Sequence, residues 1–106
     1  MFGTITVEEL KAKQDAGEKV RLIDVREAME YQICHLPDAE LKSLGQIAVW
    51  MQGLEKDEEL ILYCHHGMRS ERACMILASQ GFQHLKNLIG GIDAWSLSVD
   101  PSVPRY

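Results

Sequence analysis

The sequence predicts an α/β protein in which helices flank both faces of a central parallel sheet. Three largely apolar segments, at residues 20–25, 59–64 and 84–91, break off into charged or glycine-rich sequence, as buried strands do where they end. Helix-like segments separate them, and strands that alternate with helices favour parallel pairing. Ligands of such sheets gather at the carboxyl ends of the strands, so a site is expected where these segments end.

The length and composition predict a single globular domain. The chain has 106 residues, of which 46% are hydrophobic and 25% charged, the ordinary mixture for one domain with its own core. The net charge of −5 disfavours nucleic acid as a partner. No apolar run approaches the ~20 residues that cross a bilayer, and residues 1–13 lack the apolar core of a signal peptide. We therefore expect a cytoplasmic protein without membrane contact, with its three cysteines reduced.

The first third of the chain predicts a helix, a strand and a second helix. Thr6 is a good N-cap, and Glu9 three residues later completes a capping box. Gly17 ends that helix. The run at 20–25 (VRLIDV) has the character of a buried strand, and 26–33 (REAMEYQI) that of a short helix.

The middle of the chain predicts short elements. Pro37 forces an extended or turning chain, and 39–44 is expected to hold a short strand. Ser43 is the predicted cap of a helix that ends near Gly53. The charged stretch at 55–59 is expected to be a solvated loop.

The last part of the chain predicts the strongest strand, at 59–64 (ELILYC), and then a helix over 69–80. The buried side of that helix is expected to consist of Ala73, Met75, Ile76 and Leu77. A strand with a double-glycine turn at 84–91 and a short helix at 92–98 follow, before an irregular tail at 99–106.

The stretch LYCHHGMRS places a cysteine at the end of the strongest strand. A helix that begins at Arg69 or Ser70 leaves a very short loop after Cys64, and Gly67 permits backbone angles there that a side chain forbids. Successive N–H groups are expected to turn inward as a nest, and the helix N-terminus adds about half a positive charge. Such surroundings stabilise a thiolate. The stretch therefore predicts a nucleophilic Cys64 in an anion-binding loop formed by His65, His66, Gly67, Met68 and Arg69.

A nucleophile of this kind suits the transfer of either a sulfane sulfur or a phosphoryl group. Cysteine phosphatases present C-x-x-x-x-x-R, with room for a tetrahedral phosphate, whereas this chain has C-H-H-G-M-R, one residue shorter. The smaller ring favours a persulfide, whose outer sulfur would occupy the nest. A phosphatase also needs an acid that protonates its leaving alcohol, and no residue is marked for that role. We therefore favour sulfur transfer, with a phosphatase or arsenate reductase as the alternative.

Four separated motifs resemble those of single-domain rhodaneses, a family of sulfurtransferases: LIDVREAMEY, HLPDA, LYCHHGMRS and GGIDAW, in that order. The resemblance covers nearly the whole chain and implies one domain over 1–106, with a parallel sheet of about five strands. It implies that Cys64 takes a sulfur from a donor such as thiosulfate, forms a persulfide, and passes the sulfur to cyanide or a thiol. No cofactor is implied. A sulfur relay to a partner protein, or a regulatory binding module, is the alternative within this family.

The resemblance also implies supporting residues and shows one departure. Asp24 and Arg26 end a strand beside the predicted site, and we expect a buried pair that braces the loop, with a plain surface salt bridge as the alternative. The family pattern G-H-[IL]-P-G-A reads C-H-L-P-D-A here, with Cys34 and Asp38 in place of glycines. The backbone of that turn is therefore expected to differ.

The remaining sulfur and imidazole groups have two interpretations each. Cys34 is either a small filler at a turn, which we favour, or a thiol that forms a disulfide with Cys64. Cys74 lies among apolar residues and is expected in the core. His65 and His66 are expected to line the loop rather than to bind a metal, because adjacent residues seldom ligate one ion. Met68 forms an apolar lip at the site or is simply exposed.

Overall fold

A single parallel sheet forms the centre of the molecule, in a computed structural model that describes residues 2–106. Its strands follow the order β1-β5-β4-β2-β3, and all neighbouring pairs are parallel. They are β1 (Gly3–Ile5), β2 (Arg21–Asp24), β3 (Glu40–Leu41), β4 (Glu59–Tyr63) and β5 (His84–Leu88). The predicted α/β class and parallel sheet are therefore confirmed.

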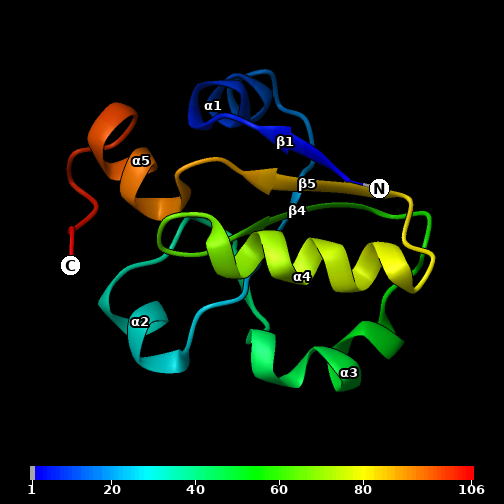
Figure 1. Ribbon diagram of the computed structural model, residues 1–106. Helices are drawn as coiled ribbons and strands as arrows, with labels where there is room; N and C mark the ends of the chain where they lie inside the picture. The colour runs from blue at the N-terminus through cyan, green and yellow to red at the C-terminus, as the bar shows by residue number, and fades with distance from the viewer. Residues whose placement is uncertain (1) are drawn as a thin grey trace.

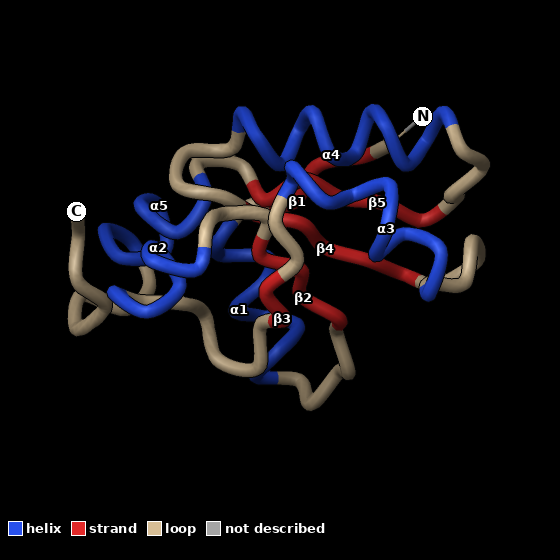
Figure 2. The backbone as a smooth tube through the Cα atoms, turned by 90° about the horizontal axis from the view of Figure 1, so that it is seen from below, coloured by secondary structure: helices blue, strands red, loops and turns tan. Residues whose placement is uncertain are grey.

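Helices cover both faces of this sheet (Figures 1 and 2). They are α1 (Val7–Asp15), α2 (Ala28–Ile33), α3 (Ile47–Trp50), α4 (Met68–Ser79) and α5 (Gly91–Ser98). Side chains alternate across a strand, so β4 contributes to two cores. Ile61 and Tyr63 join a first core with α1 and α5, whereas Leu60 and Leu62 join a second core with α3 and α4.

The predicted start of α1 is confirmed in detail. The Thr6 hydroxyl accepts from the Glu9 amide at 3.1 Å, and the Thr6 amide donates to the Glu9 carboxylate at 2.9 Å. Both bonds satisfy helix N–H groups that would otherwise lack partners, which is why this local pattern fixes the helix start.

Two predictions about helices are wrong. The helix expected after Ser43 is interrupted: two 3-10 turns, Leu44–Gln46 and Met51–Gly53, flank α3, and the Ser43 hydroxyl donates to the Arg26 carbonyl instead of capping. Met75 is 58% exposed, because the buried stripe of α4 recurs at helical spacing and leaves this position outside it. That stripe consists of Ser70, Ala73, Cys74 and Leu77.

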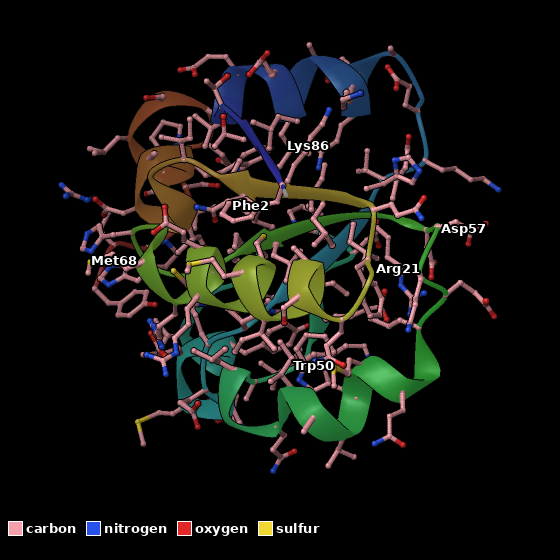
Figure 3. All side chains as sticks on the ribbon, turned by 45° about the vertical axis from the view of Figure 1, so that its right-hand side comes forward. Phe2, Arg21, Trp50, Asp57, Met68 and Lys86 are labelled. Atoms are coloured by element: carbon pink, nitrogen blue, oxygen red, sulfur yellow. The ribbon has the colours of Figure 1, made fainter. Side chains whose placement is uncertain are left out.

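The start of α4 and the surface cavity lie at opposite ends of the sheet. Met68 lies at the end where β4 leaves the sheet, and Arg21 and Asp57 lie at the other end (Figure 3). A cavity of about 370 Å³ opens at that other end, where the strands begin, and is therefore away from Cys64. None of the helices within residues 2–106 combines the length and apolar character needed to span a bilayer.

Candidate active site

The loop after β4 is as short as predicted. Cys64 follows the strand directly, and α4 already begins at Met68, with Gly67 as its N-cap at a φ of 111°. That backbone angle lies in the left-handed region, which glycine adopts without strain. Four residues, 64–67, therefore carry the chain from the strand end into the helix, and the thiol lies beside the first turn of α4.

The first turn of α5 holds the carbonyl groups of this loop. The amides of Ile92 and Asp93 donate to the carbonyls of Cys64 and His65 at 3.0 and 3.1 Å. Gly91, with a φ of 60°, approaches so closely that an added β-carbon would collide with both carbonyl oxygens. The predicted double-glycine turn, at the end of the segment 84–91, thus brings a second helix N-terminus against the cysteine loop.

Two main-chain amides face the sulfur of Cys64. The Gly67 N–H donates to Sγ at 3.1 Å and the Ser70 N–H at 3.5 Å. The inward-facing amides are thus present, although one of them comes from Ser70, beyond the predicted loop. Cys64 is only 1% exposed and packs in the second core, so the sulfur lies beneath the surface of the loop.

The Ser70 side chain completes the surroundings of the sulfur. Its Oγ lies 3.4 Å from the Cys64 sulfur and donates to Asn87 Oδ1 at 2.5 Å, and the Asn87 amide in turn donates to the Gly67 carbonyl at 3.1 Å. A hydroxyl has a single proton, and the short bond assigns it to Asn87. Neither residue was predicted to belong to the site; a polar Asn87 on the buried side of β5 was the available signal.

The guanidinium of Arg69 forms an ion pair with a carboxylate. Both of its terminal nitrogens donate to Glu30 on α2, at 2.7 and 2.9 Å. This ion pair raises the pKa of Arg69, with a smaller contribution from the nearby Cys64 thiolate, and it lowers the pKa of Glu30 to about 2. The predicted role of Arg69 as a ligand for an anion therefore has a competitor that the sequence analysis missed.

Asp24 and Arg26 form the expected buried pair. Both side chains are 0% exposed and their closest atoms are 2.7 Å apart. Asp24 also accepts from the Tyr63 hydroxyl at 2.7 Å, and Arg26 donates to the Cys34 carbonyl at 2.6 Å. These bonds fix the turn at Cys34 rather than the cysteine loop.

The buried pair reaches the cysteine loop only indirectly. Arg26 donates to the Tyr106 hydroxyl at 2.8 Å, and Tyr106 donates to Glu30 at 2.7 Å. The ring of Tyr106 stacks on His65, with ring centroids 4.0 Å apart. The tail thus connects the buried pair to the Glu30–Arg69 pair and to the loop, a connection that the predicted irregular tail at 99–106 did not suggest.

His65, His66 and Asp93 each place one potential ligand atom within 4.8 Å of the others. The two imidazoles stack with centroids 4.0 Å apart and planes 23° from parallel, so their lone pairs do not converge on one point. Asp93 also accepts from Arg105 at 2.9 Å. This arrangement packs rings at the mouth of the loop and does not resemble a tetrahedral metal site.

The other two cysteines differ from Cys64. Cys74 is 0% exposed in the second core, and burial raises its pKa to about 12, so the predicted core role is confirmed. Cys34 packs in the first core and its thiol donates to the Pro104 carbonyl at 3.3 Å. Cys34 and Cys64 therefore belong to cores on opposite faces of the sheet, which favours the filler interpretation of Cys34.

Comparisons with known proteins agree with this geometry. The family model for the rhodanese-like domain matches residues 6–98. The probable adenylyltransferase/sulfurtransferase MoeZ of Mycobacterium tuberculosis is 38% identical over 105 residues, which cover 97% of this chain but only 27% of that protein. The thiosulfate sulfurtransferase GlpE of Pseudoalteromonas translucida is 36% identical over 88 residues, covering 83% of this chain and 84% of that one.

A solved structure shows the same fold. The crystal structure of a rhodanese-like domain protein from Staphylococcus aureus matches with a TM-score of 0.82 and 30% identity, over 88% of this chain and 90% of that one. Sequence motifs, sheet order and the position of the cysteine loop lead to the same conclusion: the chain belongs to the rhodanese-like domain family.

Proposed function

We propose that this protein transfers sulfane sulfur through a persulfide on Cys64. The observation that carries the proposal is the pair of amides, from Gly67 and Ser70, that donate to the Cys64 sulfur at the carboxyl end of β4. Main-chain donors and the N-terminus of α4 stabilise negative charge on sulfur. The sulfurtransferases among the relatives support the same activity.

The reaction needs only this nucleophile, a sulfur donor and a sulfur acceptor. The Cys64 thiolate attacks the outer sulfur of the donor, the sulfur–sulfur bond of the donor breaks, and the leaving group departs with the electron pair. With thiosulfate the leaving group is sulfite. The outer sulfur of the persulfide then bonds to cyanide or an acceptor thiolate, and the Cys64 thiolate is restored. Because Cys64 is 1% exposed, the loop between β4 and α4 has to open for either partner to reach the sulfur.

A relay between protein thiols is the second candidate function. The buried sulfur favours it, because a site that opens only on contact protects a persulfide from small reactants. The protein would then load slowly from thiosulfate and quickly from a partner that carries a persulfide. The cytoplasmic location and the single domain over 1–106 are predictions from the sequence and accompany this proposal.

Intact mass measurement tests the proposal directly. The reduced protein is incubated with thiosulfate and, separately, with cysteine persulfide, then analysed before and after cyanide. We expect a gain of one sulfur atom that cyanide removes, and no such gain at this position in Cys64→Ser. Equal loading of Cys64→Ser, or no loading of the unmodified protein by either donor, contradicts the proposal. Hydrolysis of an aryl phosphate that depends on Cys64 favours the phosphatase alternative instead.

A further inference from the structure

We infer from the contacts of Glu30 that this residue determines which sulfur donors the site accepts. By occupying the guanidinium of Arg69, it removes the side-chain cation that a dianion such as thiosulfate would bind, and so favours donors that are themselves persulfides. This inference rests on the proposed sulfur transfer and names its donor class. It also adds Glu30, on α2, to the residues that act at the site.

Arg69 lies beside the cysteine loop, so its ion pair with Glu30 changes the charge that an incoming donor meets. Arg69 lies in the first turn of α4, one residue before Ser70, whose amide donates to the Cys64 sulfur. A guanidinium on this residue could stabilise a dianion that approaches the loop, but two of its donors already face the two oxygens of Glu30.

Other contacts hold Glu30 in place, so Arg69 cannot exchange it easily. The Glu27 amide donates to one carboxylate oxygen at 3.1 Å, as part of the capping box that begins α2. The Tyr106 hydroxyl donates to the other oxygen at 2.7 Å, and Tyr106 is itself fixed by a bond from Arg26. An incoming anion would have to displace a carboxylate that has three partners.

The neighbouring cations are also matched by carboxylates. Within residues 2–106, Arg26 pairs with Asp24 and Arg105 pairs with Asp93. Burial, together with the adjacent His66, lowers the pKa of His65, so this imidazole is neutral at neutral pH. The guanidinium groups of Arg26, Arg69 and Arg105 thus all have carboxylate partners, and the main-chain dipoles of the loop remain for an anion.

A persulfide donor does not need that charge. The Cys64 thiolate attacks the outer sulfur of R–S–S–H, the S–S bond of the donor breaks, and R–S⁻ leaves with the electron pair. The proton stays on the transferred sulfur, so the step balances without an oxidant or a reductant. Only one negative charge is present throughout: it begins on the Cys64 sulfur, which the amides of Gly67 and Ser70 face, and it leaves on R–S⁻.

Rates of sulfur loading on Cys64 test this inference, with thiosulfate and cysteine persulfide as the two donors. Glu30→Gln frees the guanidinium while keeping the side-chain shape. We expect the rate constant with thiosulfate to rise about tenfold, equivalent to ~1.4 kcal/mol, and the rate constant with cysteine persulfide to change little. Glu71→Gln is the matched control, because it removes one exposed negative charge from the first turn of the same helix.

A double variant, Glu30→Gln with Arg69→Met, separates charge from shape. It removes both charges, so its preference between the donors should return to that of the unmodified protein. The inference is overturned if Glu30→Gln leaves the thiosulfate rate unchanged, or if Glu71→Gln raises it equally. It also fails if the double variant loses thiosulfate loading, because Arg69 then already binds the dianion. Loading from neither donor overturns the proposed function itself, whereas loading from both without a shift overturns only the role of Glu30.

Discussion

Removal of the Ser70 hydroxyl should lower the unfolding free energy by an amount that the structure allows us to estimate. Ser70 is 0% exposed, and its hydroxyl is the partner of Asn87 Oδ1. In Ser70→Ala that oxygen loses its donor in surroundings where Asn87 is 6% exposed. The Asn87 amide cannot turn over to compensate, because its nitrogen donates to the Gly67 carbonyl. A buried acceptor without a partner costs ~1–3 kcal/mol of unfolding free energy.

Helix propensity acts in the opposite direction and can be subtracted. Alanine is the better helix former by about 0.5 kcal/mol, so part of the loss in Ser70→Ala is hidden. Ser79→Ala on the same helix carries the same gain, but Ser79 is exposed and its hydroxyl donates only to the Ile76 carbonyl. The difference between the two variants therefore isolates the buried bond.

Urea unfolding of the two variants beside the unmodified protein gives the measurement. We expect Ser70→Ala to be ~1–3 kcal/mol less stable than Ser79→Ala. If the two free energies of unfolding agree within about 0.5 kcal/mol, the scatter of ordinary surface substitutions, the Ser70–Asn87 bond does not support the loop as described.

Three further predictions concern the pairs and turns around the site. Arg26→Met leaves its buried carboxylate partner uncompensated and should cost ~3–5 kcal/mol of unfolding free energy. Arg105→Met breaks an exposed pair and should cost far less; equal losses of stability in the two variants would contradict the role of the buried pair. Gly91→Ala forces a β-carbon against two carbonyl oxygens at a φ of 60° and should cost ~1–3 kcal/mol or more, while Gly53→Ala, with open space around it, serves as the control; similar urea midpoints for the two would refute the close approach. Glu30→Gln should flatten the acid dependence of stability. The folded pKa of Glu30 lies at about 2, below its ordinary 4.5, so its contribution is complete above pH 4.5 and is lost as the pH falls toward 2; parallel stability curves over that range would argue against the ion pair.

Local sequence determined the features that involve neighbouring residues. The capping box at Thr6, the strand that ends at Cys64 and the glycine after it all depend on spacings of a few residues. The physical chemistry of such spacings is the same in most folds, because main-chain groups within one or two turns always meet in the same way. The position of Cys64 at a strand end, with the Gly67 amide facing its sulfur, was therefore predictable, whereas the second donor, Ser70, and the burial of the thiol were not.

Only the tertiary structure decided what lies across from the cysteine loop. Glu30 is 39 residues from Arg69, Tyr106 is 76 residues from Glu30, and Asn87 is 17 residues from Ser70. These residues meet because β4 lies between β5 and β2, and local propensity does not encode that strand order. The sequence by itself thus determined that Cys64 is held by main-chain amides at a strand end. The packing of α2, β5 and the tail decided the charge beside it, since the guanidinium of Arg69 is paired with Glu30 from a distant part of the chain.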